Sequence, residues 1–323
     1  QHRGRVVDAP GDNLLAEFAS AVHAVTGAVS AATWLGLAWI MARIFDRTGV
    51  FPGAGGSLGR HGRGGVLRLR QGDPLESADL ISAMQGADSV VNLIGIVNER
   101  GRDGQGFHRA HVAITEKALA ACRDADIRRF VQMSALRADP AGSSHYLRSK
   151  GVAEQRVKDS GLDWTILQPS VVFGREDDFI NRFAGLLRHL PVLPLAKANT
   201  RLAPVFVGDV VAAAVRSLEE PRAIGQIFQL CGPRVYSLRE IVRLISRLIG
   251  KQRPVLGLSP TLGKMQARLM EFVPGKPFSR DNFLTLSTHN ICDSGAPGLI
   301  DLGIVPTHLE PEVSRYLRIG AVD

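Results

Sequence analysis

The chain has 323 residues, of which 45% are hydrophobic and 22% charged. This composition supports one large globular α/β domain, or one domain with a smaller lobe. The net charge is +8, but no basic helix with interleaved aromatic residues is present, so we exclude nucleic acid as a partner. Three scattered cysteines, Cys122, Cys231 and Cys292, have no metal-ligand spacing. They predict reduced thiols in a cytosolic protein and no metal site.

Residues 24–42 form a stretch of 19 residues without a charge. That length would allow a membrane span. However, alanine is its most frequent residue and it is diluted by threonine, serine and glycine, so we do not expect it to span a membrane. No early basic region leads into a short apolar core, which argues against a signal peptide. The expected location is the cytoplasm, with peripheral attachment to the inner face of the membrane as the alternative.

From residue 66 onward, short apolar runs alternate with amphipathic segments. Strands are predicted at residues 66–70, 89–95, 129–134 and 164–167, and helices at 75–85, 106–124 and 146–160. The run at 89–95 is continuously apolar, as in a strand that is buried on both faces. Such alternation predicts an α/β fold of the Rossmann-like, doubly wound type, with a parallel sheet and a smaller C-terminal lobe.

The pattern loosens after Gly174. Asp209 is the expected cap of a helix over 210–218, and Ser237 with Glu240 forms the capping-box pattern of a helix over 237–249. The predicted division is an N-terminal tail at 1–20, a dinucleotide-binding domain at 21–174 and a C-terminal lobe at 175–323. Residues 204–230 are expected to return to the dinucleotide-binding domain.

Tyr146 and Lys150 are the most informative pair in the chain, which has only three tyrosines. Four residues apart on a helix, they share one face. A free tyrosine has a pKa of about 10, and a nearby ammonium favours the phenolate, so the pair is expected to lower the pKa of Tyr146. This arrangement suits proton transfer to or from a hydroxyl while a cofactor transfers a hydride.

Other polar residues follow neighbouring strands of the predicted sheet. Ser134 ends one strand and could orient a substrate oxygen beside Tyr146. Pro169 begins the segment that leaves the next strand and would close over a cofactor ring. Asp73 follows the strand at 66–70, near the expected place of an adenine. Each has a plain structural explanation by itself, but together they lie where ligands bind in such sheets, at the carboxyl ends of the strands.

These residues lie in runs that resemble the extended short-chain dehydrogenase/reductase superfamily, in its atypical branch. The likeness is greatest to the nucleotide-binding accessory subunit of respiratory complex I. The runs are GDP at 72–74, NLIGI at 92–96, MSALRADP at 133–140, YLRSKGVAE at 146–154, SGLDWTILQPSVVFG at 160–174, PVFVGDVV at 204–211 and LGI at 302–304. The resemblance extends over residues 66–317.

The resemblance implies a catalytic set of Ser134, Tyr146 and Lys150, with Tyr146 as acid/base and Lys150 also holding the cofactor ribose. The cofactor would be NADP or NAD, and the sequence does not decide between them. Its expected contacts are Thr26, Gly27, Asp73, Leu93, Ile94, Gly95, Lys150, Pro169, Ser170 and Val171. One departure is Gln168, where the family usually has arginine, so an anionic group contacted there would be held less well.

The phosphate-binding loop departs further from the family pattern. The family has TGxxGxxG after its first strand, whereas here Thr26 and Gly27 are followed by Ser30 and Thr33 at the second and third glycine positions. Residues 29–65 also lack the strand periodicity expected of a βαβ unit and include a run rich in glycine and arginine. Our hypothesis is a shifted reading frame over this segment, which sequencing of the gene would test.

Three functions remain open at this point. The first is an NAD(P)-dependent oxidoreductase that acts on the carbonyl or hydroxyl group of an unidentified small molecule. The second is a non-catalytic nucleotide-binding assembly protein linked to complex I, or to quinone metabolism at the membrane surface. The third and weakest is a sugar-nucleotide epimerase or dehydratase. Fold analogy does not choose among them.

Overall fold

A computed structural model describes residues 14–18, 28–29, 67–71, 73–273 and 276–319. Thr26 and Gly27 lie outside the described residues, as do nearly all of the anomalous segment 29–65 and of the uncharged stretch 24–42. Within the described part, no helix is both long and apolar enough to cross a membrane.

The centre of the described fold is a parallel sheet in the order β11-β6-β5-β4. Its strands are β4 (Ser89–Asn92), β5 (Arg129–Met133), β6 (Asp163–Pro169) and β11 (Gln226–Leu230). The middle strands β5 and β6 are almost entirely buried after their first residues, as expected where helices cover both faces of a sheet. The predicted strands at 89–95, 129–134 and 164–167 are thus confirmed, with boundaries shifted by a few residues.

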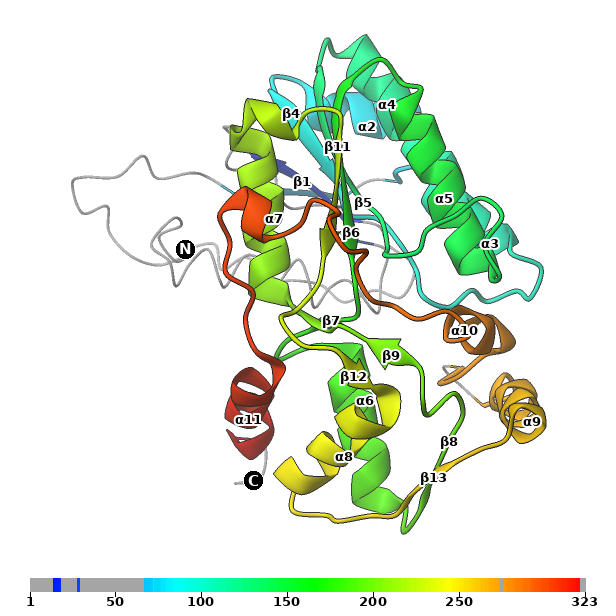
Figure 1. Cartoon of the computed structure of the whole chain (residues 1–323). Coiled ribbons are helices and arrows are strands. Elements are labelled where there is room, and N and C mark those ends of the chain that lie inside the picture. The colour runs from blue at the N-terminus through cyan, green and yellow to red at the C-terminus, as the bar shows by residue number, and fades with distance from the viewer. Residues whose placement is uncertain (1–13, 19–27, 30–66, 72, 274–275, 320–323) are drawn as a thin grey trace, which may run out of the picture.

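Helices cover both faces of this sheet (Figure 1). One face packs against α2 (Ser77–Met84), α4 (Ile114–Asp124) and α5 (His145–Lys158), and the other against α7 (Val207–Glu219). The two apolar layers are separate clusters, one containing Phe130 and Ile166, the other Val131 and Leu167. This alternation follows from the period of two along each strand. The predicted Rossmann-like α/β class is confirmed.

A second, antiparallel sheet lies at the N-terminal side of the chain. Its strands are β1 (Leu14–Phe18), β2 (Ala28–Val29) and β3 (Leu67–Gln71), in the order β2-β1-β3. The strand expected at 66–70 is therefore present. It is hydrogen-bonded to β1, which lies within the segment that the sequence predicted to be an N-terminal tail.

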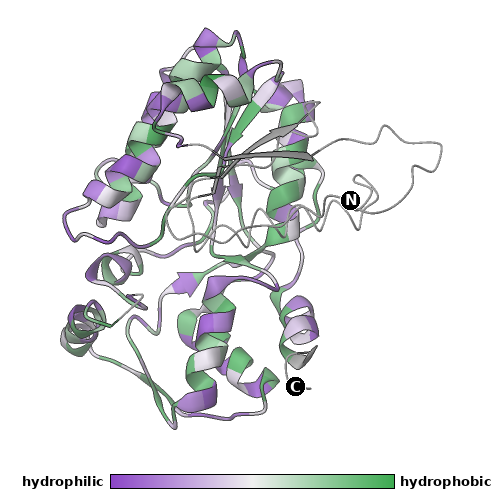
Figure 2. Cartoon of the chain, turned by 180° about the vertical axis from the view of Figure 1, so that it is seen from behind, coloured by the Kyte–Doolittle hydropathy of each residue, from purple (hydrophilic) through white to green (hydrophobic). Residues whose placement is uncertain are grey.

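The chain after β6 builds most of the lower half of the molecule in Figure 1. Its helices are α6 (Asp178–His189), α8 (Leu238–Leu248), α9 (Pro260–Met270), α10 (Arg280–Thr285) and α11 (Leu309–Ile319). Short strand pairs join them: β7 (Val172–Phe173) with β10 (Val205–Phe206), β8 (Leu193–Leu195) with β13 (Val255–Gly257), and β9 (Arg201–Leu202) with β12 (Tyr236–Ser237). Figure 2 shows that most of these helices mix hydrophilic and hydrophobic residues, as partly exposed helices do.

Two predicted helix caps have different outcomes. Ser237 and Glu240 form the expected capping box at the start of α8. Asp209 was predicted to cap the helix over 210–218, and this is wrong, because α7 begins at Val207. The Asp209 carboxylate instead accepts hydrogen bonds from the backbone N–H and the hydroxyl of Thr307, at 2.7 and 2.9 Å. It thereby fixes the chain that leads into α11.

The prediction of three reduced thiols is also wrong. Cys231, directly after β11, forms a disulfide with Cys292, which lies 61 residues further along the chain. Cys122 is a buried free thiol, and burial raises its pKa to about 12. Residues 286–299 connect α10 with the short 3-10 helix at Ile300–Leu302, and they cross the ends of β5, β6 and β11. The sequence could not predict the Cys231–Cys292 disulfide, because this crossing brings together two cysteines that lie far apart along the chain. We call residues 286–299 the strap.

Candidate functional site

The carboxyl ends of β4, β5 and β6 bring most of the predicted site residues to one edge of the sheet. Gly95 follows β4, Ser134 follows β5, and Pro169 ends β6. Helix α5 carries Tyr146 and Lys150 on its first turns alongside these strands. A ligand that enters at this edge would therefore meet groups from several elements at once.

Lys150 lies fully inside this edge, with 1% of its surface exposed. Its ammonium donates a hydrogen bond to the carbonyl of Met133 at 3.1 Å, and a Cβ atom on Gly95 would come within 3.0 Å of Nζ. Burial lowers the pKa of Lys150 to about 8, and the neighbouring Glu154 carboxylate partly opposes that shift. Among the described residues Met133 is its one recorded acceptor, so the ammonium keeps donors for another group.

Tyr146 has a different environment from the one predicted. Burial, followed by the charge of Asp281, raises the pKa of Tyr146 to about 12, so the expected lowering by Lys150 is wrong. Its ring contacts Phe107 and His111 edge-on, with centroid separations of 6.0 and 5.6 Å. The neutral phenol is therefore the stable form.

Asp281, on α10, acts on Tyr146 from the far end of the chain. Its carboxylate accepts the backbone N–H groups of His145 at 2.6 Å and Tyr146 at 3.2 Å. Ser144 caps the same helix and accepts the N–H of Leu147 at 3.1 Å. An acidic group at the first turn of a helix is stabilised by the free N–H groups there. The C-terminal lobe thus fixes the position of α5.

The hydroxyl of Ser134 is bonded to a group that the sequence did not place in the site. It donates to the buried carboxylate of Glu154 at 2.5 Å, and the amide of Gln168 donates to the same oxygen at 2.8 Å. Burial raises the pKa of Glu154, while these two hydrogen bonds oppose the shift. Gln168 therefore serves the chain's own carboxylate. The signal for Glu154 was its spacing of four residues from Lys150 on α5.

His111 is a second residue that the sequence did not assign to the site. It lies on a π-helical segment (His108–Ala113), a form often found at functional sites. Its Nε2 accepts the N–H of Ile96 at 3.0 Å, and its Nδ1 lies 2.8 Å from Ser149 Oγ, which donates to the carbonyl of Tyr146. Burial, followed by the charge of Lys150, holds the pKa of His111 well below its usual value. A neutral ring protonated at Nδ1 satisfies all three contacts.

His111 shows no metal-ligand arrangement. Among the described residues, no group of three His, Cys, Asp or Glu side chains could hold a metal ion.

The remaining residues that were predicted to contact the cofactor interact with other residues of the chain. The hydroxyl of Ser170 donates to Asn290 Oδ1 on the strap at 2.5 Å. The carbonyl of Pro169 accepts from Leu136, and that of Val171 from Val205. Asp73 accepts the N–H of Leu75 at 2.9 Å within its own turn. Leu93 and Ile94 are buried beside Gly95 in the apolar layers.

The strap holds the β6 end of the site in place. Arg137, just after β5, pairs with Asp293 at 2.8 Å and donates to the carbonyl of Ile291 at 2.7 Å. The carbonyl of Asn290 accepts the N–H of Ala203 at 3.0 Å. Together with the Cys231–Cys292 disulfide, these contacts tie the strap to three strand ends.

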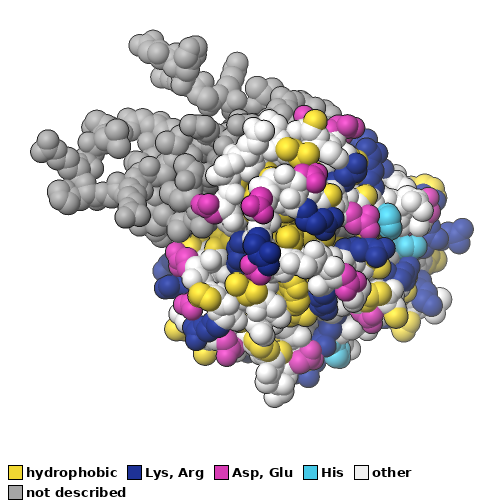
Figure 3. Space-filling view, turned by 90° about the horizontal axis from the view of Figure 1, so that it is seen from above, with side chains coloured by type: hydrophobic (Ala, Val, Ile, Leu, Met, Phe, Trp, Pro, Cys, Tyr) yellow, Lys and Arg dark blue, Asp and Glu magenta, His cyan; other side chains and the backbone are white. Residues whose placement is uncertain are grey.

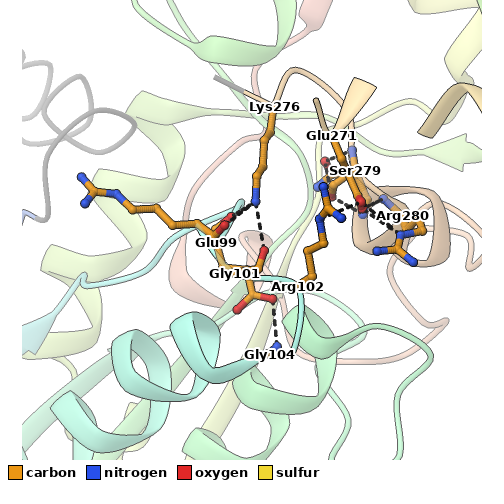
Figure 4. Close-up of polar contacts among 10 residues, drawn as sticks. Glu99, Gly101, Arg102, Gly104, Glu271, Lys276, Ser279 and Arg280 are labelled. Atoms are coloured by element: carbon orange, nitrogen blue, oxygen red, sulfur yellow. Dashed lines mark hydrogen bonds and ion pairs between the residues drawn. The ribbon is translucent and has the colours of Figure 1, made fainter. Parts of the chain in front are cut away.

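A cavity of about 220 Å³ opens beside the N-terminus of α5. Residues lining it include Phe107, His145 and Asp281, together with the loop that follows β4. Figure 4 shows how the segment between α9 and α10 holds this loop: the ammonium of Lys276 donates to the carbonyls of Glu99 at 3.0 Å and Gly101 at 2.9 Å.

The other partners of this loop are also charged. Glu271 pairs with Arg280 at 3.0 Å and with Arg102 at 3.4 Å, and the carboxylate of Glu99 accepts the N–H groups of Gly104 and Gly106. The charged groups on this side of the cavity are therefore paired with one another within the chain.

Comparisons with known proteins agree with this geometry. Residues 58–178 match the model of a family described as NAD(P)H-binding. The chain is 31% identical over 257 residues to the mouse (Mus musculus) protein NADH dehydrogenase (ubiquinone) 1 alpha subcomplex subunit 9, mitochondrial, and the match covers 79% of this chain and 67% of the relative. The chain belongs to the complex I alpha subcomplex subunit 9 family. This family is a branch of the extended short-chain dehydrogenases/reductases, as the sequence predicted.

Solved structures share the fold of this subunit 9 family member. An NADPH-dependent quinone oxidoreductase from Escherichia coli, solved with NADPH, has a TM-score of 0.60 at 21% identity, over 76% of this chain and 82% of that one. A UDP-glucose 4-epimerase from Thermus thermophilus, solved with NAD, has a TM-score of 0.59 at 17% identity, over 77% and 84%. At these identities the likeness concerns the fold alone. The chain therefore has an NAD(P)-binding, oxidoreductase-like fold.

The described residues fit a nicotinamide dinucleotide at the β4 end of the site. Lys150 is a buried cation with spare donors, and its Nζ packs so close to Gly95 that a Cβ atom there would lie 3.0 Å from it. Ribose hydroxyls are acceptors and donors of the kind that a buried ammonium can bind. When bound, the cofactor supplies or accepts a hydride. Thr26 and Gly27, which the sequence predicted as contacts of the cofactor, lie outside the described residues.

Proposed function

We propose that this chain binds NAD(P)H as a structural element and is an accessory subunit of the respiratory complex I type, without turnover of its own. The observation that carries the proposal is the state of the predicted catalytic set. Lys150 keeps donors for a ribose, whereas the Ser134 hydroxyl donates to Glu154, and burial raises the pKa of Tyr146 where the catalytic pairing with Lys150 was expected to lower it. Holding a nucleotide needs the first of these groups, and catalysis needs all three.

The family supports the same function. The mouse relative is named as a subunit of NADH dehydrogenase (ubiquinone). We infer from the likeness that this chain assembles with such a complex and works at a membrane face.

The test combines titration with turnover. Purified protein is titrated with NADPH and NADH by calorimetry, and oxidation of each is then followed with a panel of quinones and carbonyl compounds. We expect stoichiometric binding and no turnover above the buffer rate. Tyr146→Phe should leave the affinity within about twofold of wild type, because Tyr146 is not needed to hold the ribose. Turnover that Tyr146→Phe abolishes would overturn the proposal.

A second candidate is an oxidoreductase that uses Ser134, Tyr146 and Lys150 on a carbonyl or hydroxyl substrate. The observation in its favour is that Tyr146 is partly exposed, follows the cavity-lining residue His145 and lies one helical turn from Lys150. Movement of Ser134 away from Glu154 would be required first. The Tyr146→Phe experiment separates the two candidates, because catalysis depends on the phenol and nucleotide binding does not.

A further inference from the structure

Helix α9 exposes its largest apolar side chains. Leu262, Met265 and Leu269 on the helix are 47%, 53% and 59% exposed, and Phe272 and Val273, directly after it, are 70% and 41% exposed. The intervals of three and four residues place Leu262, Met265 and Leu269 on one face of the helix, and Phe272 and Val273 follow just beyond its end. We call these five residues the α9 stripe. A single exposed leucine is ordinary, but a contiguous apolar stripe of this kind marks an interaction surface.

The buried face of α9 is built from its smallest residues. Gly263 and Ala267 are buried, next to Phe283 of α10 and Ala196. A Cβ atom on Gly263 would lie 2.9 Å from the Phe283 ring and 3.1 Å from Ala196 Cβ. The helix therefore packs closely through these small residues and cannot turn its large apolar side chains inward. In an ordinary amphipathic helix the large apolar side chains pack into the core, whereas in α9 they are exposed.

Basic side chains flank the α9 stripe. Lys264 and Arg268 are exposed on the same helix, whose sequence PTLGKMQARLM contains no acidic residue. Within the described part of the chain, neither has an ion-pair partner. Arg102 lies 4.9 Å over the ring of Phe272. Glu271, the acidic residue next to the stripe, is already paired with Arg280. An apolar stripe beside unpaired cations is typical of helices that lie in the interface of an anionic membrane.

The position of α9 suits a flat partner. The helix lies at the periphery of the lower half of the molecule, packed on α10 and away from the central sheet (Figure 1). A second copy of the chain is a poor occupant, because a two-fold contact through this face would bring Lys264 and Arg268 near their own copies. On the face shown in Figure 3, in contrast, Lys and Arg side chains are interspersed with Asp and Glu.

We propose that residues 260–273 form a membrane-docking element. The α9 stripe enters the boundary between headgroups and acyl chains, and Lys264 and Arg268 contact anionic phosphates. This docking goes beyond the proposed nucleotide function and rests on different residues. The two can therefore fail independently.

The test is co-sedimentation of the full chain with vesicles of phosphatidylcholine, alone or with about one third phosphatidylglycerol. We expect binding to the anionic vesicles that weakens as salt rises. The double variant Leu269→Ser with Phe272→Ser should lower the partition coefficient at least tenfold. Lys264→Glu with Arg268→Glu should do the same and remove the salt dependence. Calorimetry should find NADPH affinity unchanged in both double variants, which separates this proposal from the proposed function.

The matched control is Val305→Ser, which removes an apolar side chain that is 82% exposed outside α9. It should bind vesicles as wild type does. Absence of wild-type binding to anionic vesicles would overturn the proposal, as would equal losses in the control. A dimer in light scattering that Leu269→Ser with Phe272→Ser disrupts, without vesicle binding by wild type, would assign the α9 stripe to self-association instead. Should the apolar double variant fail to fold by circular dichroism, the charge variant, which changes exposed residues only, decides the outcome.

Discussion

The two sides of the ligand-binding edge differ in what they leave for a ligand. On the β4 side, Gly95 keeps side chains away from the ammonium of Lys150, which retains donors. On the β6 side, Gln168 is bonded to Glu154 and Ser170 to Asn290 of the strap. The same fold can therefore hold a ribose at one side, while the polar side chains at the other side are hydrogen-bonded within the chain. The contrast suggests a site adapted to holding a nucleotide.

The largest expected effect is on protein stability, and it concerns the disulfide that holds the strap against the β6 side of the site. Replacing Cys231 and Cys292 with serine removes a crosslink across 61 residues. Without the crosslink the unfolded chain regains conformational entropy, which predicts a destabilisation of about 4 kcal/mol, measured by urea unfolding. Affinity for NADPH should stay within about twofold, because the strap does not contact Lys150. A large loss of affinity in the folded variant would mean that the two sides are coupled. Dithiothreitol should leave this variant unchanged, which excludes a contribution from Cys122.

The next largest effect concerns the β4 side. Lys150→Met removes a buried charged donor of a kind that contributes about 1.5–3 kcal/mol per hydrogen bond. NADPH affinity should fall about a hundredfold, which calorimetry would detect. Lys158→Met is the control, since Lys158 lies on the same helix with its side chain 35% exposed and only a long 4.0 Å contact to Glu154. Equal losses in both variants would show that Lys150 has no special part in holding the nucleotide.

The pH dependence of NADPH binding also tests whether the Lys150 ammonium holds the nucleotide. The folded-state pKa of Lys150 is about 8, lowered by burial from its usual 10.5. The ammonium is therefore present below pH 8 and is lost as the pH rises through 8, so affinity should decrease by up to about tenfold per unit above that pH. Lys150→Met should show a flat profile over the same range. A wild-type affinity that rises between pH 8 and 9.5 would contradict the assignment.

The pH dependence of protein stability that arises from Lys150 has the opposite sign to that of NADPH affinity: stability should increase as the pH rises. The unfolded chain binds a proton to this lysine up to about pH 10.4, whereas the folded chain releases it near pH 8. Between these values the unfolded state holds more protons, so the Lys150 contribution to the free energy of unfolding becomes more favourable as pH rises. Urea unfolding at pH 7.5 and 9.5, for wild type and Lys150→Met, would isolate that contribution.

The smallest expected effect is steric. Gly95→Ala places a methyl group 3.0 Å from Lys150 Nζ and 3.4 Å from His111 Nε2. The lysine must shift, and we expect a loss of about 1 kcal/mol in NADPH binding by calorimetry, or roughly fivefold. Gly185→Ala, on α6, is the control, because a Cβ there meets nothing within 4 Å. It should leave binding unchanged and stabilise the helix slightly. An unchanged affinity in Gly95→Ala would place the ribose elsewhere.

The strands of the sheet could be predicted from the sequence because each is marked by the residues of its own short segment. Apolar runs such as residues 89–95 and 129–134 identify buried strands without knowledge of their neighbours. The spacing of Tyr146 and Lys150 likewise placed them on one helix. The glycine-loop residues Thr26 and Gly27 remain a prediction, as does the shifted frame over 29–65, since they lie outside the described residues.

The chemistry of the site could not be predicted, because it depends on contacts between distant segments. Asp281 lies 135 residues from Tyr146, yet its charge and the burial of the ring raise the pKa that Lys150 was expected to lower. Cys292 pairs across 61 residues through a strap without periodicity. The hydroxyl of Ser134 was expected to orient a substrate oxygen beside Tyr146, and its bond to Glu154 depends on side-chain rotamers that no spacing encodes.

The most direct test of the account is NADPH titration of wild type, Tyr146→Phe and Lys150→Met in parallel, with NADPH oxidation followed in the same samples. We predict that wild type and Tyr146→Phe bind one NADPH with equal affinity, that Lys150→Met binds about a hundredfold more weakly, and that none of the three oxidises NADPH above the buffer rate. Oxidation by wild type that disappears in Tyr146→Phe would contradict the account and establish the chain as an enzyme.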